Sequence, residues 1–300
     1  MSLVPPLVSG LVGDVRDGLG RRLFARVAGP EGARRRDRVH DAEGERWFAE
    51  GSPIRRVHGD ASMFVGGIRA LLMQSLHPLA MAGVADHSGF ERDPWGRLQR
   101  TSYFLAVTTF GTAADAETMV ATVRRVHQGV EGVAPDGRSY AASDPHLLGW
   151  VHVAEIDSFL AAHQRYGAEP LDAAERDRYV ADAARVARAL GVVDPPRSEA
   201  DLRDRLEAYR PELEGTPAAR RTARFLLLDP PLPLLARLPY AGLAASAVAL
   251  MPPWSRPLLR LPRLPVTERV LVGGTGVTLT RTIRWAMGGP PRPGPEPRAR

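Results

Sequence analysis

Residues 144–159 read DPHLLGWVHVAEIDSF, and this stretch indicates the fold of the whole chain. Asp144-Pro145 is a helix-start signal, because the carboxylate can accept hydrogen bonds from free N–H groups of the first turn and proline is tolerated there. Apolar side chains follow at helical spacing, with Leu148, Ile156 and Phe159 on one stripe. The stretch therefore predicts a long helix that buries one face, and it favours an all-α fold.

The same helical spacing recurs along the chain, whereas strand alternation is hard to find. We expect helices after Asp60, from Asp93-Pro94 towards Gly111, along Val120–Val130 to about Gly132, and over 171–190, 199–209, 217–228 and 266–287. Residues 229–265 are dense in proline and leucine and are expected to form short helices joined by rigid turns. The prediction is one large helical domain over 51–287, with an N-terminal helical arm (1–50) and a disordered Pro/Arg-rich tail (288–300).

The composition excludes several kinds of chemistry. All 40 basic residues of the 300-residue chain are arginine, and cysteine is absent. Without cysteine there is no disulfide framework, thiolate metal site or cysteine nucleophile, and without lysine there is no Schiff base. The net charge of +6 comes from arginines interleaved with acids, which is typical of solvated helix faces, so nucleic acid is not an expected partner.

Two apolar or glycine-rich segments allow two interpretations each. Residues 240–251 are apolar but too short to cross a bilayer, which takes roughly 20 residues, so they suit a core helix or a shallow peripheral membrane contact. The start of the chain lacks a signal-peptide pattern, and we expect a cytoplasmic protein. The glycines at 273, 274 and 276 suit a phosphate loop less well than a close helix–helix approach.

Histidines concentrate in one part of the chain, since six of the eight lie between positions 77 and 163. His127 and His152 fall on the apolar stripes of successive helices. Each could be an ordinary core histidine, but two on neighbouring helices raise the prospect of a metal or haem site. No HExxH motif and no carboxylate–histidine repeat of the di-iron type is present, which counts against zincin and di-metal sites.

A second cluster consists of Arg97, Arg100 and Thr101, whose spacing places them on one helical face. Two guanidinium groups beside a hydroxyl suit a carboxylate, a propionate or a developing oxygen anion, although solvated arginines in a first turn would look the same. Upstream, His77 and His87 flank an expected helix break. Either could donate a proton or only brace the loop.

The succession of these short motifs resembles the family of bacterial rubber oxygenases (latex-clearing proteins) and of the fungal membrane-bound oxygenase that cleaves a farnesyl side chain. The motifs are LHP (76–78), DHS (86–88), DP (93–94), RxxRT (97–101), FGT (110–112), RVH (125–127), DGxxY (136–140) and DP to WVH (144–152). The resemblance covers roughly residues 50–285, and its specificity lies in the order of the motifs rather than in any one of them.

The resemblance implies haem b bound between the core helices. It implies that His127 is the proximal iron ligand, with His152 as the second family histidine and the alternative ligand. Arg97 and Thr101 match the arginine and threonine of the helix segment over the haem. Arg100 stands where the rubber oxygenases carry a lysine that can close off the iron. Because a guanidinium stays protonated, it cannot ligate iron, and a lysine-closed state is not accessible to this chain.

The glutamate proposed as the base of the rubber enzymes has no match, since the corresponding region around Met81 is apolar. If a base is needed, His77 or His87 would have to substitute. The expected function is a haem b-dependent oxygenase that uses dioxygen on a hydrophobic, isoprenoid or lipid-like small molecule. Two alternatives stay open: a non-catalytic haem- or lipid-binding carrier or sensor, and a non-haem enzyme that uses His77, Asp86 and His87 around a metal or as acid–base groups.

Overall fold

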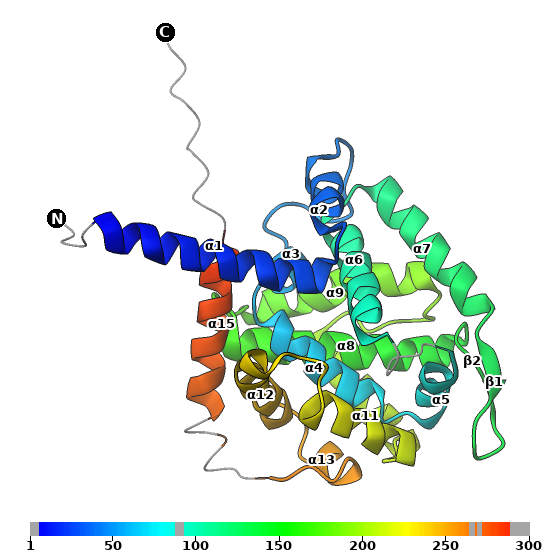
Figure 1. The fold of residues 1–300 in the computed structure, drawn as a ribbon. Helices are drawn as coiled ribbons and strands as arrows, with labels where there is room; N and C mark the ends of the chain where they lie inside the picture. Colours follow the sequence, from blue (N-terminus) through cyan, green and yellow to red (C-terminus); the bar gives the residue numbers. More distant parts are fainter. Residues whose placement is uncertain (1–5, 88–92, 264–267, 269–271, 289–300) are drawn as a thin grey trace.

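The computed structural model describes residues 6–87, 93–263, 268 and 272–288, and this part of the chain is almost entirely helical (Figure 1). The first helices are α1 (Pro6–Ala28), α2 (Gly32–Asp41), α3 (Pro53–His58), α4 (Met63–Gln74), α5 (Pro78–His87), α6 (Pro94–Phe110) and α7 (Ala113–Gln128). Strands β1 (Glu131–Val133) and β2 (Ser139–Ala141) follow. The remaining helices are α8 (Pro145–Tyr166), α9 (Ala173–Leu190), α10 (Glu199–Tyr209), the 3-10 turn η1 (Arg210–Glu212), α11 (Pro217–Leu228), α12 (Leu234–Ala249), α13 (Ser255–Leu258) and α15 (Gly273–Met287). The predicted all-α fold is confirmed.

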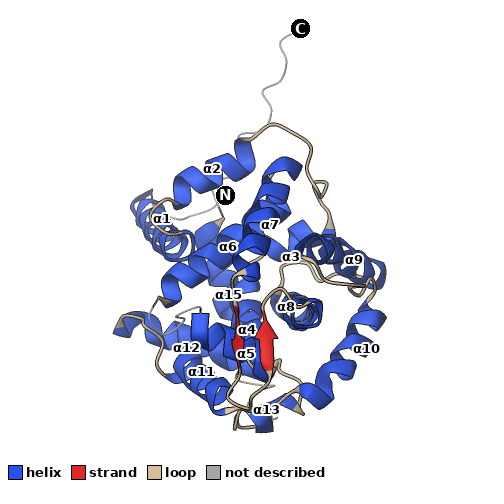
Figure 2. Ribbon diagram, turned by 90° about the vertical axis from the view of Figure 1, so that its right-hand side faces the viewer, coloured by secondary structure: helices blue, strands red, loops and turns tan. Residues whose placement is uncertain are grey.

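Helix α8 is the centre of the fold. Figure 2 shows it almost end-on with α3, α4, α9 and α10 around it, and each of these helices packs on it. Trp150, Ile156 and Phe159 of α8 are buried in the main core. Its most extensive partner is α4, where a methyl group added to Gly66 would lie 3.0 Å from the Phe159 ring. The missing side chain at position 66 thus lets the two helix backbones approach closely.

The helix-start signals in the sequence are largely confirmed. The Asp93 carboxylate accepts a hydrogen bond from the Gly96 N–H (2.9 Å), and the Asp144 carboxylate accepts one from His146 (2.8 Å). The helix expected after Asp60 is α4, which begins three residues later at Met63, so Asp60 is not the residue next to its first turn. The Asp60 carboxylate accepts hydrogen bonds from the backbone N–H of Ser62 (2.7 Å) and from the Arg284 guanidinium (2.9 and 3.0 Å). Asp60 therefore ties the entry of α4 to α15.

The β1–β2 hairpin was not expected. Its strands pair antiparallel with Gly132 opposite Tyr140, and the turn contains Gly137 at φ +87°, a left-handed conformation that glycine adopts without strain. Each strand has three residues, which is too short for an alternating pattern to stand out in the sequence. The hairpin connects α7 to α8 and so joins the helices that carry His127 and His152.

Residues 229–265 differ from expectation in part. α12 extends over 16 residues and contains Pro239, whereas α13 is a short helix of four residues, as expected. Its second half is buried against α4 and α15, which confirms the core interpretation of the apolar 240–251 segment and compensates for the hydrogen bond that proline cannot make. The helix expected over 266–287 is seen from Gly273 onwards. Positions 264–267 and 269–271 and the expected tail beyond residue 288 lie outside the described residues.

The glycine-rich start of α15 forms a helix contact, as the sequence indicated. A methyl group added to Gly276 would lie 2.6 Å from Ser246 Oγ of α12 and 2.6 Å from the Tyr166 ring of α8. Three helices therefore meet where only a hydrogen atom fits. The N-terminal part of the chain joins the same side of the molecule, since α1 lies across α15 and α6 (Figure 1). None of the described helices combines the length and the apolar character needed to cross a bilayer.

A buried ion pair lies in the α4–α8 interface. Arg69 of α4 is 3% exposed, and its guanidinium lies 2.7 Å from an Asp157 carboxylate oxygen. The same group donates hydrogen bonds to Ser158 Oγ (2.7 Å) and to the Leu250 carbonyl (3.0 Å). Arg69 thus links α4, α8 and the end of α12 through one buried charge.

Candidate functional site

The two histidines singled out by the sequence lie on either side of the hairpin. His127 is in the last turn of α7 and His152 is in the second turn of α8, and α9 packs on both of these helices. Within the described part of the chain, His127 Nδ1 and His152 Nε2 are buried and have no hydrogen-bond partner. Burial lowers the pKa of both side chains, that of His152 to about 4. Both imidazoles are therefore neutral at pH 7, which is the form that binds a metal.

Sequence reasoning missed a third group on the same part of α8. Glu155 is one helical turn after His152, so the two side chains share a face. Burial raises the pKa of Glu155 to about 7, far above that of an ordinary glutamate. Burial, with smaller contributions from the charges of Glu155 and Asp157, raises the pKa of Tyr179 on α9, which indicates that Glu155 lies near this helix. The sequence feature that could have identified Glu155 is its position as an acidic residue on an otherwise apolar stripe of the helix.

Arg97, Arg100 and Thr101, at the start of α6, differ in how exposed their side chains are. Arg97 is half-buried, and burial together with the nearby charge of Arg100 lowers its pKa. Arg100 and Thr101 are exposed, and the Arg100 guanidinium lies 3.2 Å from the capping carboxylate of Asp93. The structure therefore brings Arg97 towards the interior and leaves the other two predicted residues at the surface.

His87 and Asp86 brace the hairpin. His87 Nε2 lies 3.1 Å from the Glu131 carbonyl oxygen, and the Tyr140 hydroxyl donates a 2.6 Å hydrogen bond to the Asp86 carboxylate. These contacts join the end of α5 to both strands. Of the two roles that the sequence left open for His87, the contacts favour support of the loop.

His77 lies away from His87, at the corner between α4 and α5. It is buried, and its ring faces His146 in the first turn of α8 (ring centroids 6.2 Å apart) and the carboxylate of Glu212 in η1 (3.4 Å from Nε2). Burial lowers the pKa of His77, although the Glu212 charge opposes this. Neither His146 nor Glu212 was assigned a role from the sequence, because 66 residues separate them.

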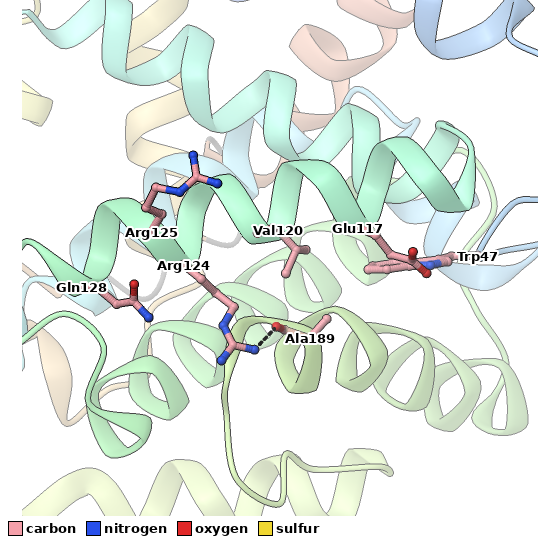
Figure 3. Close-up of a pocket in the computed structure, with 8 residues that line it drawn as sticks. Trp47, Glu117, Val120, Arg124, Arg125, Gln128 and Ala189 are labelled. Atoms are coloured by element: carbon pink, nitrogen blue, oxygen red, sulfur yellow. Dashed lines mark hydrogen bonds between the residues drawn. The ribbon is translucent and has the colours of Figure 1, made fainter.

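An open groove runs along the outer side of α7, between this helix and α9 (Figure 3). Its walls include Trp47, Glu117, Arg124 and Gln128, and Arg124 donates a hydrogen bond to the Ala189 carbonyl (3.3 Å). The groove has a volume of about 470 Å³ and contains none of the site residues predicted from the sequence. We therefore assign the candidate site to the helices that carry His127, His152 and Glu155 rather than to this groove.

Comparison with known proteins identifies a family for most of the chain. Residues 55–286 match the family described as ER-bound oxygenase mpaB/B'/Rubber oxygenase, catalytic domain. The chain belongs to this family. The resemblance noted from the sequence motifs is thereby confirmed, and the family is described as one of oxygenase catalytic domains. The matched region begins within α3 and ends within α15, and it includes every candidate site residue named above.

Two mycobacterial relatives are similar over a shorter stretch. They are "Uncharacterized protein Mb2261" from Mycobacterium bovis and "Uncharacterized protein Rv2237" from Mycobacterium tuberculosis, each 33% identical over 108 residues. The match spans 36% of this chain and 42% of each relative, which is less than half the length of these proteins. No solved structure matches the chain with significant similarity.

Proposed function

We propose that the protein is a haem b-dependent oxygenase that acts on a hydrophobic, isoprenoid or lipid-like small molecule. The observation that carries the proposal is the presence of two partly buried imidazoles on α7 and α8, which burial keeps neutral and each of which has a buried ring nitrogen without a partner among the described residues. Buried polar atoms are normally hydrogen-bonded, so an unpartnered imidazole nitrogen in an oxygenase fold suits coordination of iron.

Two arginines of α6 bear on the haem proposal. When bound, haem iron supplies the activation of dioxygen. His127 would hold the iron, with His152 as the alternative ligand. Arg97 carries a partly buried positive charge, which suits a haem propionate. Arg100 is exposed, paired with Asp93 and permanently protonated, so it offers the iron no ligand of the kind that lysine offers.

The glutamate proposed as the base of the rubber enzymes has no match in this sequence. We assign the role of general base to Glu155 instead. A base works best when its pKa lies near the operating pH, and burial brings the pKa of Glu155 to about 7. The carboxylate accepts a proton only when ionised, so its contribution is present above pH 7 and is lost as the pH falls. His77 and His87 are less suited to this role, since the first faces Glu212 and the second binds the hairpin.

The substitution Glu155→Gln should therefore lower the rate of oxygen consumption by about 100-fold or more at pH 8. The wild-type rate should rise between about pH 6 and pH 8, and the residual rate of the variant should not. Oxygen uptake across this pH range measures both effects, with Glu207→Gln on the surface of α10 as the matched control. Equal pH profiles for the two variants would assign the base to another residue.

Exposed leucines support the hydrophobic substrate class and the peripheral membrane contact. Leu234, Leu235 and Leu238, in the first turns of α12, are 81%, 95% and 82% exposed. Side chains at this spacing share one side of a helix, and the exposed Arg237 lies beside them. Such a surface suits a contact with lipid from which an apolar substrate could be drawn. The expected cytoplasmic location stays a prediction.

The double variant Leu235→Ser/Leu238→Ser should bind vesicles of phosphatidylcholine and phosphatidylglycerol at least about 10-fold more weakly than the wild type, because each leucine loses most of its burial in lipid. Co-sedimentation with the vesicles provides the measurement. Val193→Ser, which removes an apolar side chain that is 70% exposed elsewhere, is the control and should bind normally. If the double variant sediments like the control, the α12 leucines are not the lipid contact.

The absorption spectrum tests the cofactor, and oxygen uptake tests the activity. Protein expressed with adequate haem supply should show a Soret band and about one iron per chain. It should then consume oxygen when isoprenoid alkenes are added. A Soret band without oxygen uptake over a broad alkene panel would favour the carrier or sensor alternative. Absence of the band together with oxygen uptake would favour a non-haem enzyme.

A further inference from the structure

Three side chains outside the proposed haem site converge at one end of α8. They are His77 at the α4–α5 corner, His146 in the first turn of α8 and Glu212 in η1, and each offers one ligand atom within 4.8 Å of the others. His146 Nε2 lies 2.8 and 3.0 Å from the two carboxylate oxygens of Glu212, and His77 Nε2 lies 3.4 Å from the nearer one. Three segments that are distant in the sequence thus place two imidazoles and a carboxylate around one point.

His77 gives an independent sign that this point binds a ligand. Its side chain is 2% exposed, and neither of its ring nitrogens makes a hydrogen bond in the described part of the chain. A buried imidazole with no partner loses hydration without compensation, which native structures seldom tolerate. The distance of 3.4 Å from Nε2 to the carboxylate is long for a hydrogen bond, but it leaves the nitrogen directed at the same carboxylate that His146 contacts.

The surrounding contacts hold the three side chains in place. The Tyr209 hydroxyl donates a hydrogen bond to the His146 carbonyl (2.8 Å), and the Glu214 N–H donates one to the Leu76 carbonyl (2.8 Å). The centroid of the Trp150 ring lies 6.3 Å from that of the His77 ring. These bonds link the backbone near the three ligands, whereas the side chains of His146 and Glu212 are about half exposed and accessible to an entering ion.

We propose that His77, His146 and Glu212 form a binding site for one divalent transition-metal ion of the Zn²⁺ class. Two imidazoles and one carboxylate suit such ions, whereas Mg²⁺ and Ca²⁺ prefer sites made of oxygen ligands alone. The ion binds through His77 Nε2, His146 Nε2 and the carboxylate, and it replaces the His146–Glu212 hydrogen bond. Solvent fills the remaining coordination position, as is usual for sites with three protein ligands.

The site differs from the metal set suggested by the sequence. His77 was grouped there with Asp86 and His87, but the structure directs those two residues to the hairpin and gives His77 two other partners. The proposed ion would join the α4–α5 corner, the start of α8 and η1. It uses none of the residues assigned to haem. An experiment can therefore refute the metal-site proposal without affecting the haem proposal, and the reverse is also true.

Zn²⁺ binding to the full, tag-free chain tests the inference. After treatment with a chelator, which leaves haem in place, isothermal titration with Zn²⁺ should show one ion per chain. His146→Gln and Glu212→Gln should each weaken binding by at least about 100-fold, since loss of a second-shell group alone often costs 10–100-fold. Both residues are about half exposed, so these variants should fold even if a His77 variant does not.

Glu207→Gln and His40→Gln are the matched controls, and both should bind Zn²⁺ as the wild type does. A 10-fold excess of Mg²⁺ should not compete. The inference is overturned if no saturable binding at one ion per chain is found, or if the His146 and Glu212 variants bind as tightly as the controls. The Soret band, recorded in the same samples, reports on the haem proposal and should not change when Zn²⁺ is removed.

Discussion

Replacement of His127 by alanine should abolish the Soret band of the purified protein and reduce its iron content to a tenth or less of the wild-type value. Bound haem would be held chiefly by a histidine ligand to its iron, and His127 Nδ1 is a buried nitrogen with no partner among the described residues. The low pKa that burial gives this imidazole keeps it neutral and ready to ligate. Absorption spectra and iron analysis of the variant provide the measurement.

His152→Ala decides between the two candidate ligands. If this variant loses the band while His127→Ala keeps it, His152 is the residue that holds the iron. His40→Ala removes an exposed histidine on α2 and serves as the matched control, which should retain the band. If both His127→Ala and His152→Ala contain as much haem as this control, the proposed haem site is wrong.

Substitution of Arg69 by alanine should lower the free energy of unfolding by about 3–5 kcal/mol, because it leaves the Asp157 carboxylate and the Leu250 carbonyl without their buried partner. Urea unfolding of variants with equal haem content measures the difference. Arg205→Ala removes an ion pair at the surface and should cost less than about 1 kcal/mol. A similar small loss for both variants would mean that the buried pair contributes little to the stability of the α4–α8 interface.

The sequence predicted the helices well where capping chemistry is local. Pro217 and Leu228 bound α11 as expected, and Glu199 and Tyr209 bound α10. The predictions failed where tertiary packing outweighs local preference. Pro239 interrupts the pattern of residues 229–265, yet burial of the following residues against α4 and α15 keeps α12 continuous.

The candidate site was predictable only in part. His127 and His152 stand out because each is a polar residue on an apolar stripe. Glu155 gains its significance from burial beside α9, and the position of Arg97 relative to Arg100 depends on which side of α6 faces the protein. Such properties depend on neighbours that are distant in the sequence, and a periodic pattern contains no information about them.

The contact between α1 and α15 has a consequence for the way the chain folds. The Arg16 guanidinium donates a hydrogen bond to the Trp285 carbonyl (2.9 Å), which joins residues 269 positions apart. During synthesis α1 leaves the ribosome long before its partner, so this contact can form only after most of the other helices have been made. The loop that it closes is among the longest in the molecule, and closure of long loops is entropically costly and slow. We therefore expect docking of α1 onto α15 to be a late step in folding.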